Sequence, residues 1–212
     1  MSMQWISALA AADASTRLNA ALALGSNPDP ELLDALLERC AVEPDFYVRD
    51  MLTWALIRLP PDLTVPRLLT ELHATRAQAR SQALHTLSKI RDARAWPALT
   101  AALLHDSDDE VARSAWRAAV VLVPPGQERN LAVQLAAALG RGDGHVQLSL
   151  SRALLALGAQ VVEPLLREAM QSADQGVREH AHATERLLHD PQAASEAALR
   201  EAKRAFVLAR ER

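Results

Sequence analysis

Cysteine is almost absent from this chain. Of 212 residues only Cys40 is a cysteine, so the sequence excludes an internal disulfide and any zinc site built from several cysteines. Such sparing use of cysteine is typical of proteins from a reducing compartment. We therefore expect a buried Cys40 thiol and a cytoplasmic protein.

Aromatic residues, excess positive charge and long apolar runs are scarce as well. Aromatics make up 3% of the chain, and the formal net charge is −3, which argues against binding dominated by nucleic-acid phosphates. A local basic stripe that binds nucleic acid remains an alternative. No apolar run approaches the roughly 20 residues of a membrane-spanning helix, and no Lys or Arg precedes Arg17, so we expect no secretory leader. Lysine occurs only at 89 and 203, which resembles the coding bias of a GC-rich bacterium.

What the chain does contain is a repeated pattern of Asp and Arg, spaced four residues apart. Successive copies stand 31 to 34 residues apart: Asp13–Arg17, Asp45–Arg49, Asp109–Arg113 and Asp174–Arg178, with Asp143–Gln147 as a variant. The copy centred on Arg80 lacks the Asp but offers Thr75 and Gln78 at the spacing of a capping box. An Asp that accepts free N–H groups in a first helical turn contributes about 1 kcal/mol. We interpret the Asp column as helix caps.

After each cap, apolar residues recur at i, i+4, i+7, i+8 and i+11, the spacing of one helical face. The matching sets are Val48, Leu52, Ala55, Leu56, Leu59; Val146, Leu150, Ala153, Leu154, Leu157; Ala79, Ala83, Thr86, Leu87, Ile90; and Ala112, Trp116, Ala119, Val120, Val123. Further helical segments lie between them, several with Pro in or just before the first turn. The pattern predicts a string of helix pairs.

A Pro-bearing first helix, a D-x-x-V-R turn and an A-x-x-A-L second helix together resemble the HEAT repeat superfamily, with its related phycobilisome-lyase-type helical repeats. The turn is seen at Asp45, Val48, Arg49 and again at Asp174, Val177, Arg178. The resemblance implies an all-α, right-handed α-solenoid of about six HEAT-like helix pairs plus a C-terminal capping helix near 192–210. We expect a single domain over 1–212, with repeats at about 1–25, 26–60, 61–92, 93–124, 125–158 and 159–190. Thr184 and Glu185, polar where other repeats are apolar, suit a terminal repeat with a solvated end.

Proteins of this type usually bind other macromolecules, and the second helix of each pair lines their concave surface. There, Trp54 lies off the apolar stripe, in a column with His85, Ala118, Arg152 and Ala183. An exposed Trp is the residue type most enriched at binding hot spots. The candidate partner-binding residues are Trp54, Met51, Arg58, His85, Lys89, Arg117 and Arg152. The alternative is that Trp54 packs over the neighbouring repeat. Phe46 and Tyr47 are assigned to packing at the turn.

Other functions remain as alternatives. The inner row Arg58, Lys89, Arg117, Arg152 and Arg186 is mildly basic against Asp50 and Glu179, which keeps a nucleic-acid-binding protein of the DNA base-excision type open. The Arg column at 17, 49, 80, 113 and 178 is interpreted as a structural ladder of hydrogen bonds, because similar repeats use this Arg structurally.

A metal-binding enzyme is the remaining alternative. His182, Glu185 and His189 share one helix face and are residue types that ligate iron or zinc, but the His-Glu dipeptides of HEAT-like iron hydroxylases are missing from the sequence. Ser81 and His85 stand four apart on a helix without a nucleophile elbow. We predict a non-catalytic scaffold with a protein or peptide partner, no cofactor, no metal and no small-molecule substrate.

Overall fold

The computed structural model describes residues 2–190 and shows an all-α chain, with α-helices and two 3-10 helices and no strand in that range. The capping helix expected near 192–210 lies outside the described residues. No helix within residues 2–190 is long and apolar enough to cross a bilayer. The chain divides into two compact units, unit 1 up to Pro125 and unit 2 from Gly126, at the boundary between the fourth and fifth repeats. The single domain over 1–212 stays a prediction.

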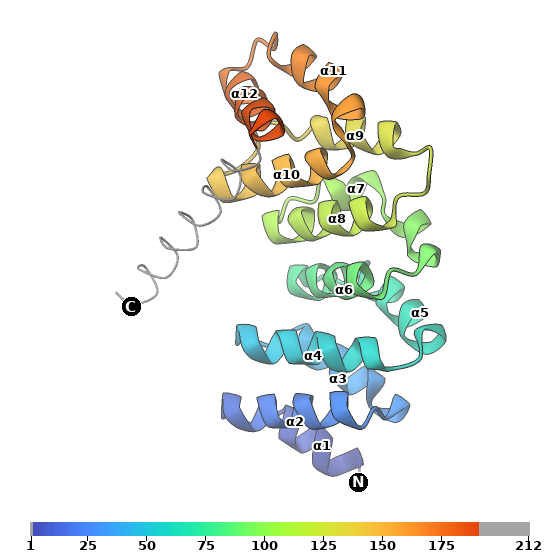
Figure 1. The fold of residues 1–212 in the computed structure, drawn as a ribbon. Coiled ribbons are helices and arrows are strands. Elements are labelled where there is room, and N and C mark those ends of the chain that lie inside the picture. Colours follow the sequence, from blue (N-terminus) through green and yellow to red (C-terminus); the bar gives the residue numbers. More distant parts are fainter. Residues whose placement is uncertain (1, 191–212) are drawn as a thin grey trace. The chain divides into compact units, whose positions relative to one another are not determined.

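Unit 1 contains four helix pairs stacked in two layers (Figure 1). The second helices α2, α4, α6 and α8 pack side by side in one layer, and each is backed by the first helix of its pair. The bounds are α1 (Ser2–Leu9), α2 (Ala14–Ser26), η1 (Pro30–Leu32), α3 (Leu33–Cys40), α4 (Phe46–Arg58), α5 (Pro61–Glu71), α6 (Ala77–Ile90), η2 (Ala93–Ala98), α7 (Ala101–Leu104) and α8 (Asp109–Leu122).

Unit 2 contains two further pairs, which contact each other through α9 with α11 and α10 with α12. Their bounds are α9 (Glu128–Ala136), α10 (Gly144–Ala156), α11 (Ala159–Ala169) and α12 (Gln175–His189). The repeat boundaries, like the single domain, stay a prediction.

The Asp column caps the second helices, as expected. The side chain of Asp45 accepts the Val48 N–H at 3.0 Å, and Asp174 accepts the Val177 N–H at 3.1 Å. Asp13 and Asp143 cap α2 and α10 in the same way. The apolar stripe that follows is core: Val48, Leu52, Ala55, Leu56 and Leu59 are all buried, as are Val146, Leu150, Ala153, Leu154 and Leu157.

The fourth repeat is shifted by one residue from its prediction. The cap of α8 is Asp108, which accepts the N–H groups of Glu110 and Val111, and not Asp109. The stripe therefore starts at Val111 and runs through Ala115, Ala118, Ala119 and Leu122, all buried. Arg113 falls one position outside the arginine column. It pairs with Glu110 on its own helix, and its Nε is buried without a partner among the described residues.

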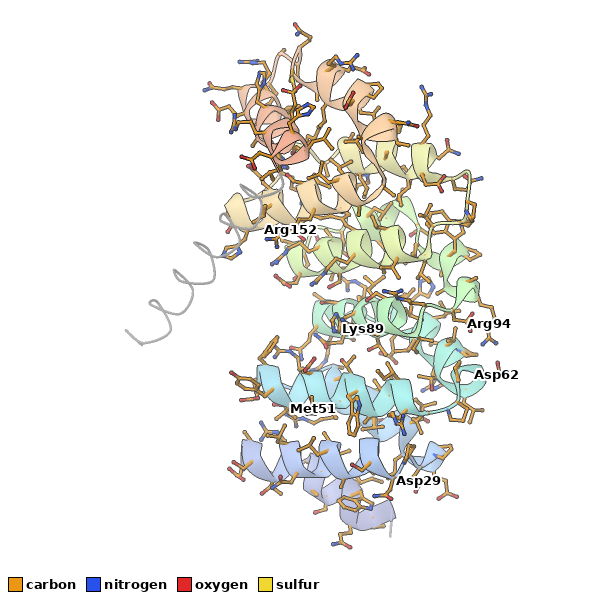
Figure 2. The ribbon with its side chains drawn as sticks, viewed as in Figure 1. Asp29, Met51, Asp62, Lys89, Arg94 and Arg152 are labelled. Carbon is orange, nitrogen blue, oxygen red and sulfur yellow. The ribbon has the colours of Figure 1, made fainter. Side chains whose placement is uncertain are left out.

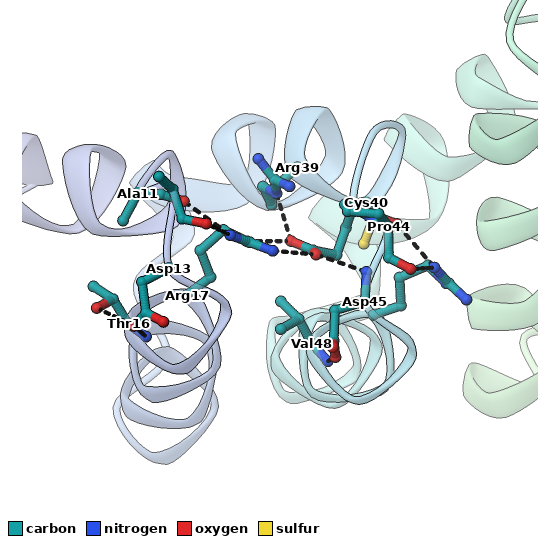
Figure 3. Close-up of polar contacts among 12 residues, drawn as sticks. Ala11, Asp13, Thr16, Arg17, Arg39, Cys40, Pro44, Asp45 and Val48 are labelled. Atoms are coloured by element: carbon teal, nitrogen blue, oxygen red, sulfur yellow. Dashed lines mark hydrogen bonds and ion pairs between the residues drawn. The ribbon is translucent and has the colours of Figure 1, made fainter. Parts of the chain in front are cut away.

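At the other predicted positions the arginine column is a structural ladder, as expected (Figure 3). Arg17 donates from Nη1 to the carbonyl oxygens of Ala11 and Ala12 at 2.9 and 2.7 Å, and from Nε and Nη2 to the Glu43 carboxylate at 2.7 and 2.8 Å. Glu43 is fully buried. Its burial opposes ionisation, but the hydrogen bonds from Arg17, the Asp45 N–H and Arg39 outweigh that cost and lower the pKa of Glu43 to about 2.

Arg80 repeats the contacts of Arg17 two helix pairs along. It donates to the carbonyl oxygens of Ala74 and Thr75 at 2.9 and 3.0 Å and pairs with Asp106 at 3.0 Å. Asp106 stands two residues before the cap of α8, as Glu43 stands two residues before the cap of α4. Arg49 and Arg178 make the carbonyl contacts but form no ion pair with a described residue.

The link between α4 and α6 is of another kind. Ala74 occupies the position of the missing acid, two residues before the α6 N-cap Arg76. The Gln78 side chain instead donates to the carbonyl oxygens of Cys40 and Glu43, each at 2.8 Å. The Thr75 and Gln78 capping box is therefore wrong, because the Gln78 amide finds acceptors in the preceding repeat. A neutral hydrogen-bonded link replaces the ion pair found on either side.

Candidate protein-interaction surface

One face of α4 presents a stripe of four side chains spaced three or four residues apart: Tyr47, Met51, Trp54 and Arg58. All but Tyr47 were predicted site residues. Met51 and Trp54 are half-buried, while Tyr47 and Arg58 are exposed. The same positions on neighbouring helices hold Leu22 on α2, His85 and Lys89 on α6, and Arg117 on α8, each exposed or half-buried. We call these residues, namely Leu22, Tyr47, Met51, Trp54, Arg58, His85, Lys89 and Arg117, the open face of unit 1. Figure 2 shows Met51 and Lys89 on α4 and α6.

The register of α8 decides which residue joins Trp54 in its column. Trp54, His85 and Arg117 each stand nine residues after the N-cap of their helix. Ala118, the residue expected there, is fully buried, because the cap lies at Asp108. With the cap at Asp108, the cation Arg117 occupies the same position on its helix as Trp54 and His85 do on theirs.

The Trp54 ring lies on the backbone of α2. A methyl group added at Gly25 would stand 2.1 Å from both Cε3 and Cζ3 of the ring, so Gly25 is the residue that lets the indole approach this closely. One edge of the ring thus packs on the neighbouring repeat, and the side chain as a whole is half-buried. Its role in partner binding stays a prediction.

Phe46 and Tyr47 do not pack at the turn, contrary to their assignment. They are 65% and 71% exposed and contact each other edge to face, with ring centroids 5.6 Å apart. Arg49 covers one side of the Phe46 ring at 6.0 Å. Because the core stripe begins only at Val48, both rings point to solvent, and Tyr47 extends the apolar part of the open face.

The electrostatics of the open face are set by cations. Arg117 donates to the Ser114 hydroxyl at 3.1 Å and to the Arg113 carbonyl at 3.3 Å, both neutral acceptors. Burial and the nearby charges of Arg117 and Lys89 lower the pKa of His85, while Asp50 opposes this shift. His85 is therefore neutral at pH 7 in the free protein.

The Ser81 and His85 pair is not a catalytic arrangement. Ser81 is buried, and its hydroxyl shares a hydrogen bond with Ser114 of α8 at 3.2 Å. Arg152, the last candidate site residue, is exposed on α10. It belongs to unit 2 and so is not part of the open face of unit 1.

Unit 2 has a buried polar cluster that sequence reasoning missed. The His180 ring accepts the Gly140 N–H at Nδ1 at 3.0 Å, so the proton of the neutral ring is on Nε2. That Nε2 lies 2.9 Å from the Gln147 carbonyl oxygen and 3.0 Å from the Ser151 hydroxyl. Burial lowers the pKa of His180. In this tautomer the imidazole cannot accept the Ser151 proton, so the pair is structural.

Thr184 belongs to the same cluster, which overturns its interpretation as part of a solvated end. It is fully buried, donates to the His180 carbonyl at 2.9 Å and contacts the Ser151 hydroxyl at 2.8 Å. His182 and His189 are exposed on the same helix. No group of three or more His, Cys, Asp or Glu residues within the described chain could hold a metal ion.

Unit 1 has two further features of the kind that form sites, a cysteine and a cavity. Cys40 is buried, as expected, and burial raises the pKa of its thiol to about 12, which leaves no thiolate at neutral pH. A cavity of about 410 Å³ lies between α3 and α5. The ion pair of Asp34 with Arg67, at 2.7 Å, joins its two walls. That cavity is in the layer of first helices and shares no residue with the open face.

Comparison with known proteins supports the repeat architecture. No curated protein matches the chain. A chain of the complex of CpcE and CpcF of phycocyanin lyase from Nostoc sp. PCC7120 is 21% identical, covers 92% of this chain and 79% of its own length, and has a TM-score of 0.51. An engineered protein is 19% identical, with 91% and 97% covered and a TM-score of 0.48. Residues 41–119 match the family model described as HEAT repeats, the family that the sequence pattern resembles.

Proposed function

We propose that this protein is a non-catalytic scaffold that binds a protein or peptide segment on the open face of unit 1. The observation that carries the proposal is the solvent-facing stripe of Tyr47, Met51 and Trp54 on α4. Large apolar side chains that lie together at a surface mark interaction sites, whereas single exposed ones are ordinary. Tyr, Trp and Met are also enriched at protein interfaces.

The absence of chemistry is part of the same proposal. Within the described residues, Ser151 meets a histidine in the tautomer that cannot act as its base, and Ser81 is engaged with Ser114. The Cys40 thiol is protonated at neutral pH because of its burial. These groups favour structural roles over nucleophilic ones.

A site-specific cross-linking experiment tests the proposal. A photoreactive amino acid replaces Met51 or Lys89 in the full chain, and, as the matched control, Leu63, which is exposed on α5 in the other layer. We expect a protein partner to be cross-linked from positions 51 and 89 and not from 63. Equal cross-linking at all three positions, or recovery of nucleic acid at 51 and 89, contradicts the proposal.

The affinity of the partner segment identified in this way then tests the anchor. We expect Trp54→Ala to weaken binding at least about fivefold, since a hot-spot truncation costs more than about 1 kcal/mol. Because the ring also covers Gly25, binding is measured at a temperature where circular dichroism shows the variant to be folded. Unchanged affinity in the folded variant removes Trp54 from the site.

A further inference from the structure

In unit 1, the cations with carboxylate partners and the cations of the open face lie in different places. On the turns and in the layer of first helices, most arginines have carboxylate partners: Arg17 and Arg39 with Glu43, Arg67 with Asp34, Arg80 with Asp106, and Arg94 with Asp62 and Asp92. The exceptions are Arg49, Arg76 and Arg91, which form no ion pair with a described residue. The pair of Asp62 and Arg94 is visible in Figure 2. On the open face, Arg58, Lys89 and Arg117 have no ion-pair partner among the described residues.

Unpaired cations thus occur elsewhere in this unit as single residues, but on the open face three of them form a row beside an apolar stripe, an arrangement suited to anions from outside. The three stand on three consecutive second helices, α4, α6 and α8. They adjoin the apolar stripe Tyr47, Met51 and Trp54, and Arg58 lies on that stripe itself, four residues after Trp54. Two acids interact with this region: Asp50 through His85, and Glu110, already paired with Arg113, through Arg117. They leave the row of three cations net positive.

From this arrangement we propose that the occupant of the open face is an acidic peptide segment with a large apolar anchor, whose carboxylates pair with Arg58, Lys89 and Arg117 while the anchor packs on Met51 and Trp54. This inference rests on the proposed function and specifies the partner's chemistry. Neighbouring packed helices are about 8–10 Å apart. Arg58 and Lys89 stand at the same position after the N-caps of their helices, so the carboxylates that pair with these two must be about as far apart. That distance is about three residues in an extended chain or about five to seven in a helix, where a spacing of seven keeps both carboxylates on one face.

The same cations would also attract phosphates, but the apolar stripe favours a peptide. Binding of single strands relies on aromatic faces free for base stacking. On the open face, one edge of the Trp54 ring packs on Gly25 and Met51 is not aromatic, which leaves Tyr47 as the one well-exposed ring. A single ring gives no platform for successive stacked bases. The formal net charge of −3 adds no general attraction for a polyanion.

Selection from a displayed library of random 12-residue peptides on the immobilised full chain tests the inference. Parallel selections use Trp54→Ala, the double variant Lys89→Gln/Arg117→Gln, and Arg76→Gln/Arg91→Gln as a control that removes two exposed cations from outside the open face. We expect enriched peptides with Asp or Glu at spacings of three or seven and a large apolar residue. A synthetic peptide from this pool should bind at least about fivefold more weakly to the double variant and normally to the control.

Each other outcome has a separate meaning. Peptides that depend on Trp54 but are neutral or basic overturn the acidic-partner inference and leave the proposed function standing. Peptides that all ignore Trp54→Ala overturn the proposed function itself. A single-stranded 20-nucleotide oligonucleotide that binds more tightly than every selected peptide, and is lost in the double variant, overturns both.

Discussion

Replacement of Glu43 by Gln tests the physical basis of the repeat ladder. The side chain is fully buried and accepts hydrogen bonds from Arg17, Arg39 and the Asp45 N–H. Gln keeps the shape but removes the negative charge, and the buried Arg17 guanidinium is left without its counter-ion. Removing one partner of a buried pair typically costs about 3–5 kcal/mol.

The pKa of Glu43 gives an independent magnitude. Folding lowers it from 4.5 to about 2, which corresponds to about 3 kcal/mol at roughly 1.4 kcal/mol for each pH unit. Because the folded-state pKa is the lower one, this stabilisation is complete above pH 4.5 and is lost as the pH falls through 2. Gln does not titrate. The difference in unfolding free energy between wild type and Glu43→Gln should therefore be about 3 kcal/mol at pH 7 and shrink steadily below pH 4.5.

Urea unfolding of the full chain between pH 7 and pH 3 measures this difference, with amide hydrogen exchange in α2 and α4 as the local readout. Glu38→Gln is the matched control, because Glu38 is exposed on α3 and has no ion pair with a described residue; it should change stability by less than about 0.5 kcal/mol. A Glu43→Gln loss below about 1 kcal/mol, or one equally large at pH 7 and pH 3, refutes the reasoning.

Four further outcomes follow from particular contacts. Gly25→Ala should shift Trp54 outward, move its fluorescence to longer wavelength and lower the unfolding free energy by about 1–3 kcal/mol. Gly144→Ala, whose added methyl group meets no atom within 4 Å, should leave the unfolding free energy unchanged. Because burial lowers the pKa of His180, protection of unit 2 amides from exchange should fall as the pH drops below about 6.5, a dependence that His182→Gln leaves unchanged. Binding of an acidic peptide should tighten from pH 7 to pH 6 in wild type but not in His85→Gln, since a bound carboxylate raises the lowered pKa of His85. Ala74→Glu should give Arg49 the missing acid and raise the unfolding free energy by about 0.5–1 kcal/mol; no gain in urea unfolding would show that the position cannot form the pair.

Local signals were enough to predict the helix pairs, the Asp caps and the buried stripes, because capping and amphipathic spacing act within one helix. The register of α8 was ambiguous at this level. Asp108 and Asp109 are adjacent and both suit an N-cap, and the Ala-rich stretch that follows has apolar residues in either phase. The two-residue offset between Asp106 and Asp108, which repeats that between Glu43 and Asp45, is the signal that would have resolved it.

Contacts between repeats were beyond the reach of local patterns. The Gln78 side chain does not cap its own helix but donates to the carbonyl oxygens of Cys40 and Glu43. Local patterns could not predict these acceptors, because they lie 38 and 35 residues away in the sequence. His180 is buried because Gly140, 40 residues earlier, donates to its ring. A polar side chain is stable in such a core only when it has a hydrogen-bond partner. In both cases the partner lies outside the helix that carries the side chain, so the pattern within that helix does not reveal it.

The position of the candidate surface relative to the ladder bears on how binding would act. Buried or half-buried Arg–carboxylate pairs join the first repeat to the second and the third to the fourth, while a neutral Gln78 contact joins the second to the third. The open face lies across this neutral junction, with Met51, Trp54 and Arg58 on one side and His85, Lys89 and Arg117 on the other. A ligand that contacts both sides binds the folded chain, in which α4 and α6 pack together, and not the unfolded chain, so by linkage it must stabilise this packing. The neutral junction thus lies where a partner could supply the cross-repeat ion pairs that the chain itself omits.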